Sequence, residues 1–423
     1  MKYKRPRGTQ DIVPPAVHIW REVEEAFKRT FEKHCYEQIR TPIFESTELF
    51  ERAVGEQTDI ISKEMYTFTD RGGRSLTLRP ENTASVIRAY LESGMHRRGG
   101  IVRLYYIGPM FRYDRPQAGR YRQFHQVGLE AIGGASPAID VEVIETFMIT
   151  LEELGFRGLM LKLNSVGCRT CRGPYRKLLL KALDGVREVL CSDCEDRAFK
   201  NPLRVFDCKR CEGVKEKLPT ILANLCKDCR AHYDAVKAAL EALGRSFEED
   251  PYLVRGLDYY TRTAFEVIHG DLGAQNALCG GGRYDDLVEQ CGGPPTPAIG
   301  YSAGLERIIS VLPKDSPVLR EAGVPPDIYV ACVDEGGMSR ALKIASLLRS
   351  VAAVEADFSM RSLKTQLRSA EKSGAKIAAI VDSSSRDEIL WKNLAERKQV
   401  GVPDGDILDF AKRTLAASKE DGA

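Results

Sequence analysis

Residues 101–130, IVRLYYIGPMFRYDRPQAGRYRQFHQVGLE, predict a long β-hairpin. The first part, residues 101–111, is apolar and aromatic, which is typical of a buried strand. The segment 114–119 contains a proline and a glycine, which mark a turn. Polar and apolar residues alternate again from Tyr121 to Leu129, as in an antiparallel strand that returns along the first. The pattern therefore predicts two paired strands joined by a short loop.

The mouth of this hairpin is strongly basic. Residues 97–122 contain one acid, Asp114, and seven arginines: Arg97, Arg98, Arg103, Arg112, Arg115, Arg120 and Arg122. A guanidinium is always charged and binds phosphate through a fixed fork, so such a cluster attracts a polyanion; a solvated basic rim is the alternative. Gln126 and Glu130 lie four residues apart on the return strand and share one face. One hairpin thus combines phosphate-binding arginines with an acidic ligand pocket.

Length and composition narrow the class of protein. A chain of 423 residues exceeds one ordinary hydrophobic core, so two or three domains are expected. The formal net charge is only +2, so a nucleic-acid partner would be bound by local basic patches. No apolar run reaches the ~18 residues of a membrane span, and the basic start MKYKRPRG leads into no apolar signal region. In a large chain without an apolar signal region, twelve cysteines indicate reduced thiols rather than disulfides, and we expect a cytoplasmic protein.

The N-terminal third predicts an amphipathic helix followed by short strands. Apolar residues at steps of three and four indicate the helix: Val17, Trp20, Val23, Phe27 and Phe31. Residues 40–50 predict a short strand with Pro42 near its start and a helix after it. Residues 66–78 predict two strands around a turn. Residues 79–83, RPENT, then lead into a helix, and Thr83 is a suitable N-cap.

Three segments resemble the signature motifs of class II aminoacyl-tRNA synthetases. The pairs FR at 111–112 and DR at 114–115, with the following RYRQFHQ, resemble the second motif, specifically that of the histidyl-tRNA synthetase family. Residues 40–50 resemble the first motif, which in that family forms the dimer interface around a proline; Pro42 is as readily an edge-strand proline. Residues 298–307, AIGYSAGLER, resemble the third motif.

Two further segments are similar to those peculiar to histidyl-tRNA synthetases. LVRGLDYYTRTAFEV at 253–267 resembles the first, in which the arginine, here Arg255, reaches the α-phosphate of ATP. CGGGRYD at 279–285 resembles the second, in which the glycines allow close backbone approach to the ligand. A triple glycine alone would be weak evidence for a phosphate loop, because no Lys-Ser/Thr follows it.

The resemblance implies one site for ATP, Mg²⁺ and histidine. It implies that Arg112 and Arg255 are catalytic and stabilise the α-phosphate. ATP contacts are implied for Arg112, Asp114, Arg255 and Arg307. Histidine contacts are implied for nine residues: Glu81, Asn82, Thr83, Arg120, Gln126, Glu130, Tyr259, Tyr260 and Tyr284. Gln117 lies where the family meets the extra guanosine that marks tRNA for histidine.

Two of these positions depart from the family pattern. Asp114 is one methylene shorter than the glutamate usual there, which leaves open whether its contact with adenine is direct or through water. Asn82 stands where many relatives have glycine, which leaves open the backbone contact at that position.

Residues 165–247 form an insertion rich in Lys, Arg and Cys. It contains four Cys-x-x-Cys pairs: Cys168/Cys171, Cys191/Cys194, Cys208/Cys211 and Cys226/Cys229. Two pairs can surround one tetrahedral Zn²⁺, and the favoured ligand set is Cys191, Cys194, Cys208 and Cys211. Reduced cysteines packed in a small helical insertion are the alternative, and the sequence leaves both open. The family places an insertion here that closes over the acceptor arm of tRNA, and its basic residues suit that role.

The C-terminal part predicts a separate α/β domain. Prolines mark a linker at 313–326. Beyond it, strands at 328–333, 351–358 and 377–381 alternate with helices, which argues for a three-layer domain with a largely parallel sheet. A basic stripe along one predicted helix consists of Arg361, Lys364, Arg368 and Lys372. The domain resembles the anticodon-binding domain shared by histidyl-, glycyl-, threonyl- and prolyl-tRNA synthetases, in which unstacked anticodon bases are read.

The expected architecture is α+β. An antiparallel-sheet catalytic domain is formed by residues 1–164 and 248–312, a helical insertion by 165–247, and an anticodon-binding domain by 327–423, after the linker. The implied reaction is ATP-dependent ligation of L-histidine to its tRNA through histidyl-adenylate, with release of AMP and pyrophosphate, by a homodimer not bound to a membrane. One alternative is a catalytically silent, synthetase-like regulatory subunit of ATP phosphoribosyltransferase; those normally lack the anticodon domain. Another class II synthetase, such as glycyl or threonyl, would lack RGLDYY.

Overall fold

The fold is described from a computed structural model. The structure describes residues 3–55, 58, 60–114, 120–208, 210–270, 277–321, 323, 325–385 and 387–420. It divides into two compact units, Met1–Ala322 and Gly323–Ala423, which are treated separately below. Among the described residues, no helix combines the length and the apolar composition required to cross a bilayer.

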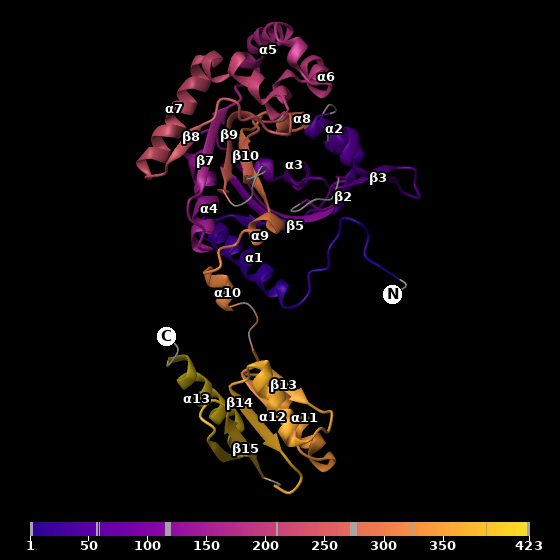
Figure 1. The fold of residues 1–423 in the computed structure, drawn as a ribbon, viewed down its shortest axis with the longest axis vertical. Coiled ribbons are helices and arrows are strands. Elements are labelled where there is room, and N and C mark those ends of the chain that lie inside the picture. The colour runs from indigo at the N-terminus through magenta and orange to yellow at the C-terminus, as the bar shows by residue number, and fades with distance from the viewer. Residues whose placement is uncertain are drawn as a thin grey trace. The chain divides into compact units, whose positions relative to one another are not determined.

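An eight-stranded sheet forms the centre of the first unit, in the order β1-β5-β6-β11-β10-β9-β7-β8 (Figure 1). The strands are β1 Glu37–Gln38, β5 Val102–Phe111, β6 Gln123–Ile132, β7 Met160–Ser165, β8 Phe247–Glu249, β9 Thr261–Ile268, β10 Ala277–Arg283 and β11 Ala298–Gly304. Neighbours are antiparallel except at the two edges, where β1 pairs with β5 and β8 with β7 in parallel. The α+β class with an antiparallel catalytic sheet is confirmed, as is the hairpin, which is β5 and β6.

Helices α1 (Ala16–Lys33) and α4 (Pro137–Glu153) cover one face of this sheet. Their apolar residues pack against side chains that alternate along the strands, such as Val127 and Leu129 of β6. Because neighbouring side chains on a strand point to opposite faces, Gln126 and Glu130 face the other side of the sheet. The hydrophobic core thus fixes which face of the sheet carries polar groups.

A smaller layer frames that polar face. It consists of the three-stranded sheet β2-β4-β3 and nearby helices. The elements are β2 Phe44–Ser46, α2 Thr47–Val54, the π-helix Ile60–Glu64, β3 Tyr66–Thr69, β4 Ser75–Leu78, α3 Thr83–Glu92 and α8 Leu287–Gln290. Helices α9 (Leu305–Ser310) and α10 (Pro317–Glu321) instead pack with α1 in the core on the opposite face. Pro42 lies two residues before the start of β2, which is an edge strand of its sheet.

The insertion is helical. Its main helices are α5 Arg169–Asp184, α6 Ser192–Lys200 and α7 Lys227–Ala242, with the short 3₁₀ turns Arg187–Val189, Pro202–Asp207, Glu212–Lys217 and Leu222–Asn224 between them. Figure 1 shows α5 and α6 beyond the ends of the central strands, while α7 runs back alongside β7 and β8. Cysteine side chains make up much of the insertion's small core, together with Tyr175, Leu179 and Phe206.

The second unit has its own sheet and core. Strands β12 Ile328–Cys332, β13 Val354–Asp357, β14 Ile377–Val381, β15 Glu388–Asn393 and β16 Gln399–Pro403 form a sheet in the order β13-β12-β14-β15-β16. Helices α11 (Met338–Leu348) and α13 (Ile407–Glu420) pack on one face and α12 (Leu363–Ser373) on the other. The first three strands are parallel as expected, and the last two add an antiparallel edge that the sequence pattern did not indicate.

Candidate active site

A cavity of about 450 Å³ lies on the polar face of the central sheet. Its walls come from four neighbouring strands of the sheet, which are β6, β11, β10 and β9. The end of β5 and the loops around these strands complete the walls. Nine of the residues expected at an ATP and histidine site line it: Glu81, Arg112, Asp114, Arg120, Gln126, Arg255, Tyr259, Tyr260 and Arg307. Residues that are far apart in the sequence therefore share one enclosed space.

Three arginines enter this cavity from different elements. Arg112 follows β5, Arg255 precedes β9, and Arg307 lies on α9. Arg112 Nε donates to the carbonyl oxygen of Pro80 at 2.8 Å, and its guanidinium lies 5.3 Å from the centroid of the Phe124 ring. Arg307 Nη1 donates to the carbonyl oxygen of Ala277 at 3.0 Å. Hydrogen bonds to carbonyl oxygens orient these two guanidinium groups without neutralising their charge.

The arginines also act on one another. Burial lowers the pKa of Arg307, and the positive charges of Arg120 and Arg112 lower it further. Burial likewise lowers the pKa of Arg112. An arginine remains protonated in proteins despite such shifts. These arginines therefore repel one another across the cavity, although five carboxylates also line it: Glu64, Glu81, Asp114, Glu266 and Glu306. A triphosphate bound between the arginines would relieve that repulsion.

The Arg255 side chain packs against β9 and β10. Its Nη1 forms an ion pair with Glu266 Oε1. Burial favours the neutral form of Arg255, but the Glu266 carboxylate and Tyr260 outweigh it and raise the pKa. Gly280 pairs with Glu266 across the strands, and a Cβ added to Gly280 would lie only 1.8 Å from Arg255 Nη2. The glycine is thus required for the guanidinium to lie flat against β10.

A buried acidic and phenolic cluster lies beside the cavity, and its members Thr83, Glu130 and Tyr284 do not themselves line it. The Glu130 side chain is buried and accepts hydrogen bonds from Thr83 Oγ1, at 2.8 Å, and from the Tyr284 hydroxyl. Burial raises the pKa of Glu130 to about 8; the bonds from Tyr284 and Thr83 oppose this shift, and the Glu81 carboxylate adds to it. The Tyr259 ring lies 4.8 Å from the Tyr260 ring and 5.7 Å from the Tyr284 ring, measured between centroids.

The pocket also offers an unused acceptor. Gln126 is buried on β6 and lines the cavity, and its Oε1 has no hydrogen-bond partner among the residues that the structure describes. A buried acceptor of this kind costs free energy unless a ligand supplies a donor. The Glu81 carboxylate lies nearby, where it accepts from the backbone N–H groups of Thr83 and Ala84 at 2.7 and 3.0 Å.

A family model described as Histidyl-tRNA synthetase matches residues 8–171 and 174–308. The chain belongs to the histidyl-tRNA synthetase family. The histidine–tRNA ligase of Desulfitobacterium hafniense (strain DSM 10664 / DCB-2) is 44% identical over 426 residues, covering 100% of both chains. That of Natranaerobius thermophilus is 48% identical over 409 residues, which cover 95% of this chain and 97% of the relative. The crystal structure of apo S. aureus histidyl-tRNA synthetase is similar with a TM-score of 0.80 and 35% identity, covering 97% of this chain and 100% of that one.

The start of α3 differs from the simple N-cap alternative. Asn82, not Thr83, occupies the N-cap position, and the Glu81 carboxylate satisfies the backbone N–H groups. Thr83 can therefore donate its hydroxyl to Glu130. The Asn82 side chain instead accepts from Thr41 Oγ1 at 2.7 Å, and it lines a separate hollow of about 430 Å³.

Two other expected residues are paired with each other. Arg120 Nη1 lies 2.8 Å from Asp114 Oδ2, and both side chains line the cavity. The cavity wall thus holds an acid and a base that ligands can separate. Gln117, expected at tRNA, lies outside the described residues.

The sequence analysis missed two groups: Glu266 in the cavity wall, and Tyr106, which lines the separate hollow on the side of Asn82. The Tyr106 hydroxyl is buried beside Thr83 without a well-formed hydrogen bond, and burial together with the Glu130 charge raises its pKa well above the ordinary value. Glu266 lines the cavity and holds Arg255. Tyr105 and Tyr106 are adjacent, so only the strand register reveals which one faces the site; Tyr106 pairs with Gly128, between Gln126 and Glu130.

The insertion gathers its cysteines into two clusters. The Sγ atoms of Cys191, Cys194, Cys208 and Cys211 all lie within 4.8 Å of one another, so the favoured set is brought together. The same is true of Cys168, Cys171, Cys226 and Cys229. The pairing of the outer Cys-x-x-Cys pairs with each other was not predicted, because they lie at opposite ends of the insertion.

Proposed function

We propose that this chain ligates L-histidine to its cognate tRNA in two steps, through histidyl-adenylate, with release of pyrophosphate and then AMP. The observation that carries this function is the convergence of Arg112, Arg255 and Arg307 beside the buried Glu130 pocket. Relatives that are named histidine–tRNA ligases match the full length of the chain. The catalytically silent regulatory subunit is the poorer alternative, since its relatives normally lose the arginine-bearing segments.

Adenylate formation requires positioning and charge neutralisation rather than a general base. The carboxylate of histidine is already ionised and attacks the α-phosphate of ATP, and pyrophosphate leaves. Arg112 and Arg255 neutralise the charge that develops on the α-phosphate oxygens, and Arg307 holds the far phosphates. Asp114 lies on the same wall and would contact adenine.

Mg²⁺ fits this cavity as a companion of ATP. The ion prefers oxygen ligands and is usually held by substrate phosphates with one or two carboxylates. Glu266 and Glu306 line the cavity and are the protein carboxylates suited to that role. When bound, the ion spreads the negative charge of the phosphates.

Histidine is selected by buried polar groups that match its ring and its amino group. Glu130 and Tyr260 hold the two ring nitrogens and fix the tautomer, while Tyr259 and Tyr284 close the sides of the pocket. The ammonium group is held by Glu81, Thr83 and Gln126, with the backbone at Asn82, and the carboxylate by Arg120 once it separates from Asp114. A ligand without the ring nitrogens leaves Glu130 and Tyr260 unpaired, which rejects it by about 10⁴ or more.

In the second step a terminal ribose hydroxyl of tRNA takes the histidyl group and AMP leaves. The insertion would contact the acceptor arm, Gln117 the extra guanosine, and the second unit the anticodon. On α12 of that unit, Lys364, Arg368 and Lys372 are exposed along one side, which suits an anionic backbone. Arg361 lies just before the helix and pairs with Asp357.

Three further assignments complete the proposal. Cys191, Cys194, Cys208 and Cys211 bind a structural Zn²⁺, for which thiolate donors fit; Cys191 Sγ and Cys208 Sγ are 3.7 Å apart. The chain forms a homodimer through the small sheet, where Ile43, Phe44 and Phe68 are 45, 50 and 43% exposed. The protein acts in the cytoplasm, where its cysteines, all free, stay reduced.

The test is amino-acid-dependent exchange of labelled pyrophosphate into ATP with the purified full chain. We expect exchange with histidine and none above background with glycine or threonine. Exchange with another amino acid would make the chain a different class II synthetase. No exchange with any amino acid, from a folded protein that binds histidine, would favour the regulatory alternative.

A further inference from the structure

We propose that Cys168, Cys171, Cys226 and Cys229 bind a second structural Zn²⁺, and that this ion holds the backbone behind the histidine pocket. The ion would sit where the insertion leaves and rejoins the catalytic sheet, a different place from the Cys191 cluster. Its influence on histidine rests on the proposed function, whereas its existence does not.

The sulfur geometry fits a tetrahedral ion. Cys168 Sγ lies 3.8 Å from Cys171 Sγ and 3.9 Å from Cys226 Sγ, and all four sulfurs lie within 4.8 Å of one another. Ligands at the Zn–S distance of about 2.3 Å are separated by about 3.8 Å in a tetrahedron. A disulfide would instead bring two sulfurs to about 2.05 Å. The spacing therefore suits four thiolates around one metal ion.

The backbone is shaped around these sulfurs. The N–H of Cys226 donates to Cys171 Sγ at 3.1 Å, just as the N–H of Cys191 donates to Cys211 Sγ at 3.3 Å in the other cluster. Gly167 has φ +65°, and a Cβ there would lie 2.9 Å from Cys171 Cβ, so only glycine permits this turn. Apolar packing alone does not require amide groups to point at sulfur, whereas a metal-bound thiolate accepts such bonds.

Both halves of the cluster begin a helix that reaches the histidine pocket. Cys168 directly precedes α5 and Cys226 directly precedes α7. On α5, Arg172 Nε donates to the carbonyl oxygen of Val166 at 3.0 Å, and its Nη2 donates to that of Tyr260. The residue beside Cys171 thus fixes the backbone of a pocket tyrosine.

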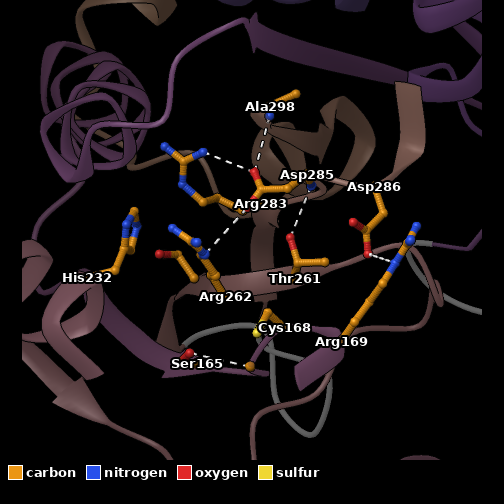
Figure 2. Close-up of polar contacts among 12 residues, drawn as sticks. Ser165, Cys168, Arg169, His232, Thr261, Arg262, Arg283, Asp285, Asp286 and Ala298 are labelled. Atoms are coloured by element: carbon orange, nitrogen blue, oxygen red, sulfur yellow. Dashed lines mark hydrogen bonds and ion pairs between the residues drawn. The ribbon is translucent and has the colours of Figure 1, made fainter. Parts of the chain in front are cut away.

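Two further contacts tie the helices to the segment that carries Tyr284. Figure 2 shows Arg169, beside Cys168, directed toward Asp286; Arg169 Nε and Asp286 Oδ2 are 2.9 Å apart. On α7, His232 Nε2 lies 2.8 Å from Asp140 Oδ2, and that carboxylate forms an ion pair with the fully buried Arg283. Arg283 directly precedes Tyr284 and Asp286 follows it by two residues, so an ion that fixes both helix starts also fixes the segment that carries Tyr284.

The first experiment counts metal. The full chain is purified without chelators, and zinc and iron per chain are measured by mass spectrometry for the wild type and three variants. We expect about two zinc ions in the wild type and in Cys35→Ser, a matched exposed cysteine outside both clusters. Cys226→Ser and Cys208→Ser should each keep about one. A single zinc in the wild type that survives in Cys226→Ser, or iron in place of zinc, would overturn the proposal.

If Cys226→Ser fails to fold, the number of metal sites is measured instead by titrating the wild type. Metal-free protein is titrated with Co²⁺, whose absorption reports tetrahedral thiolate ligation. Saturation at about two ions per chain supports the second site, whereas saturation at about one in the wild type and at none in Cys208→Ser excludes it.

The second experiment tests the link to histidine. We expect Cys226→Ser to raise the KM for histidine in pyrophosphate exchange roughly 10-fold or more, with the KM for ATP changed less than about 2-fold. Cys208→Ser should leave both KM values within about 2-fold of the wild type. If Cys226→Ser lost the ion but kept the wild-type KM for histidine, the second Zn²⁺ would not hold the histidine pocket. Absence of exchange in the wild type would instead contradict the proposed function, and the metal count would still stand.

Discussion

In the proposed function, recognition of the histidine ring depends most on Glu130. It is 1% exposed and accepts hydrogen bonds from Thr83 and Tyr284. We expect Glu130→Gln to raise the KM for histidine roughly 30-fold, because it replaces a charge-assisted hydrogen bond that contributes about 2 kcal/mol. Pyrophosphate exchange at varied histidine measures this. The exposed Glu241→Gln on α7 is the control, and a KM for Glu130→Gln equal to that control would remove Glu130 from the ring contact.

The same carboxyl makes the empty protein sensitive to pH. Burial raises the pKa of Glu130 from 4.5 to about 8. Between these values the folded protein keeps the proton and the unfolded chain has lost it, so the free energy of unfolding falls as pH rises. Glu130→Gln lacks this contribution. We therefore expect its Tm, relative to the wild type, to increase from about pH 5 to about pH 8. Calorimetry without histidine checks this, and Tm curves that stay parallel would contradict it.

At the scale of an element, the absence of a side chain at Gly280 of β10 lets the Arg255 guanidinium lie against the strand. The Cβ of Gly280→Ala would lie 1.8 Å from Arg255 Nη2, which is the flexible end of a side chain. We expect the guanidinium to move while the strand remains, so kcat for pyrophosphate exchange falls about 10²-fold or more and the Tm changes little.

A second glycine provides the matched control for this strand. Gly173 lies inside α5, and a Cβ there meets nothing within 4 Å. Gly173→Ala should keep full activity, and its Tm should change little, because a Cβ directly before Pro174 disfavours the helical conformation and offsets the gain from replacing glycine. If Gly280→Ala retained the kcat of the control, the position of Arg255 would not limit adenylate formation.

The sequence predicted best those elements whose pattern is local. Residues 377–381 are a continuous apolar run and form β14 with the same bounds, and the hairpin strand expected at 101–111 is β5, Val102–Phe111. Strands β15 and β16 were missed, since β15 takes its place by pairing with β14, and β16 by pairing with β15, rather than by their own composition. Periodicity reveals which residues are buried, but it does not reveal which strand lies beside which.

The site shows the same division. The resemblance supplied the arginines and the residues around Glu130, and the cavity brings most of them together. Tyr106 and Glu266 could not be found in this way, because nothing in their neighbourhood marks which face of the strand they occupy. The capping role of Glu81 was also not predicted, since threonine is a common N-cap residue and glutamate is not. Only the fold shows that the Thr83 hydroxyl donates to Glu130 instead.

At the scale of the whole molecule, we expect the two units to divide the reaction. Every described residue that lines the cavity lies between Ile60 and Arg307, and the second unit has a separate core. We therefore expect residues 1–322 alone to keep histidine-dependent pyrophosphate exchange within about 3-fold of the full chain. Charging of tRNA should fall in kcat/KM by about 10²-fold, equal to about 2.7 kcal/mol, because the anticodon contacts are lost.

A full-length variant separates this effect from a folding defect. Arg368→Glu, on the exposed side of α12, should lower kcat/KM for tRNA and leave exchange unchanged, because a reversed charge repels the RNA backbone where a phosphate or base is bound. The exposed Arg349→Glu is the matched control in the same unit. Loss of exchange in a folded 1–322 fragment would mean that adenylate formation needs the second unit. Equal charging by Arg368→Glu and Arg349→Glu would mean that α12 does not face the tRNA, and the basic stripe would then be a solvated helix surface.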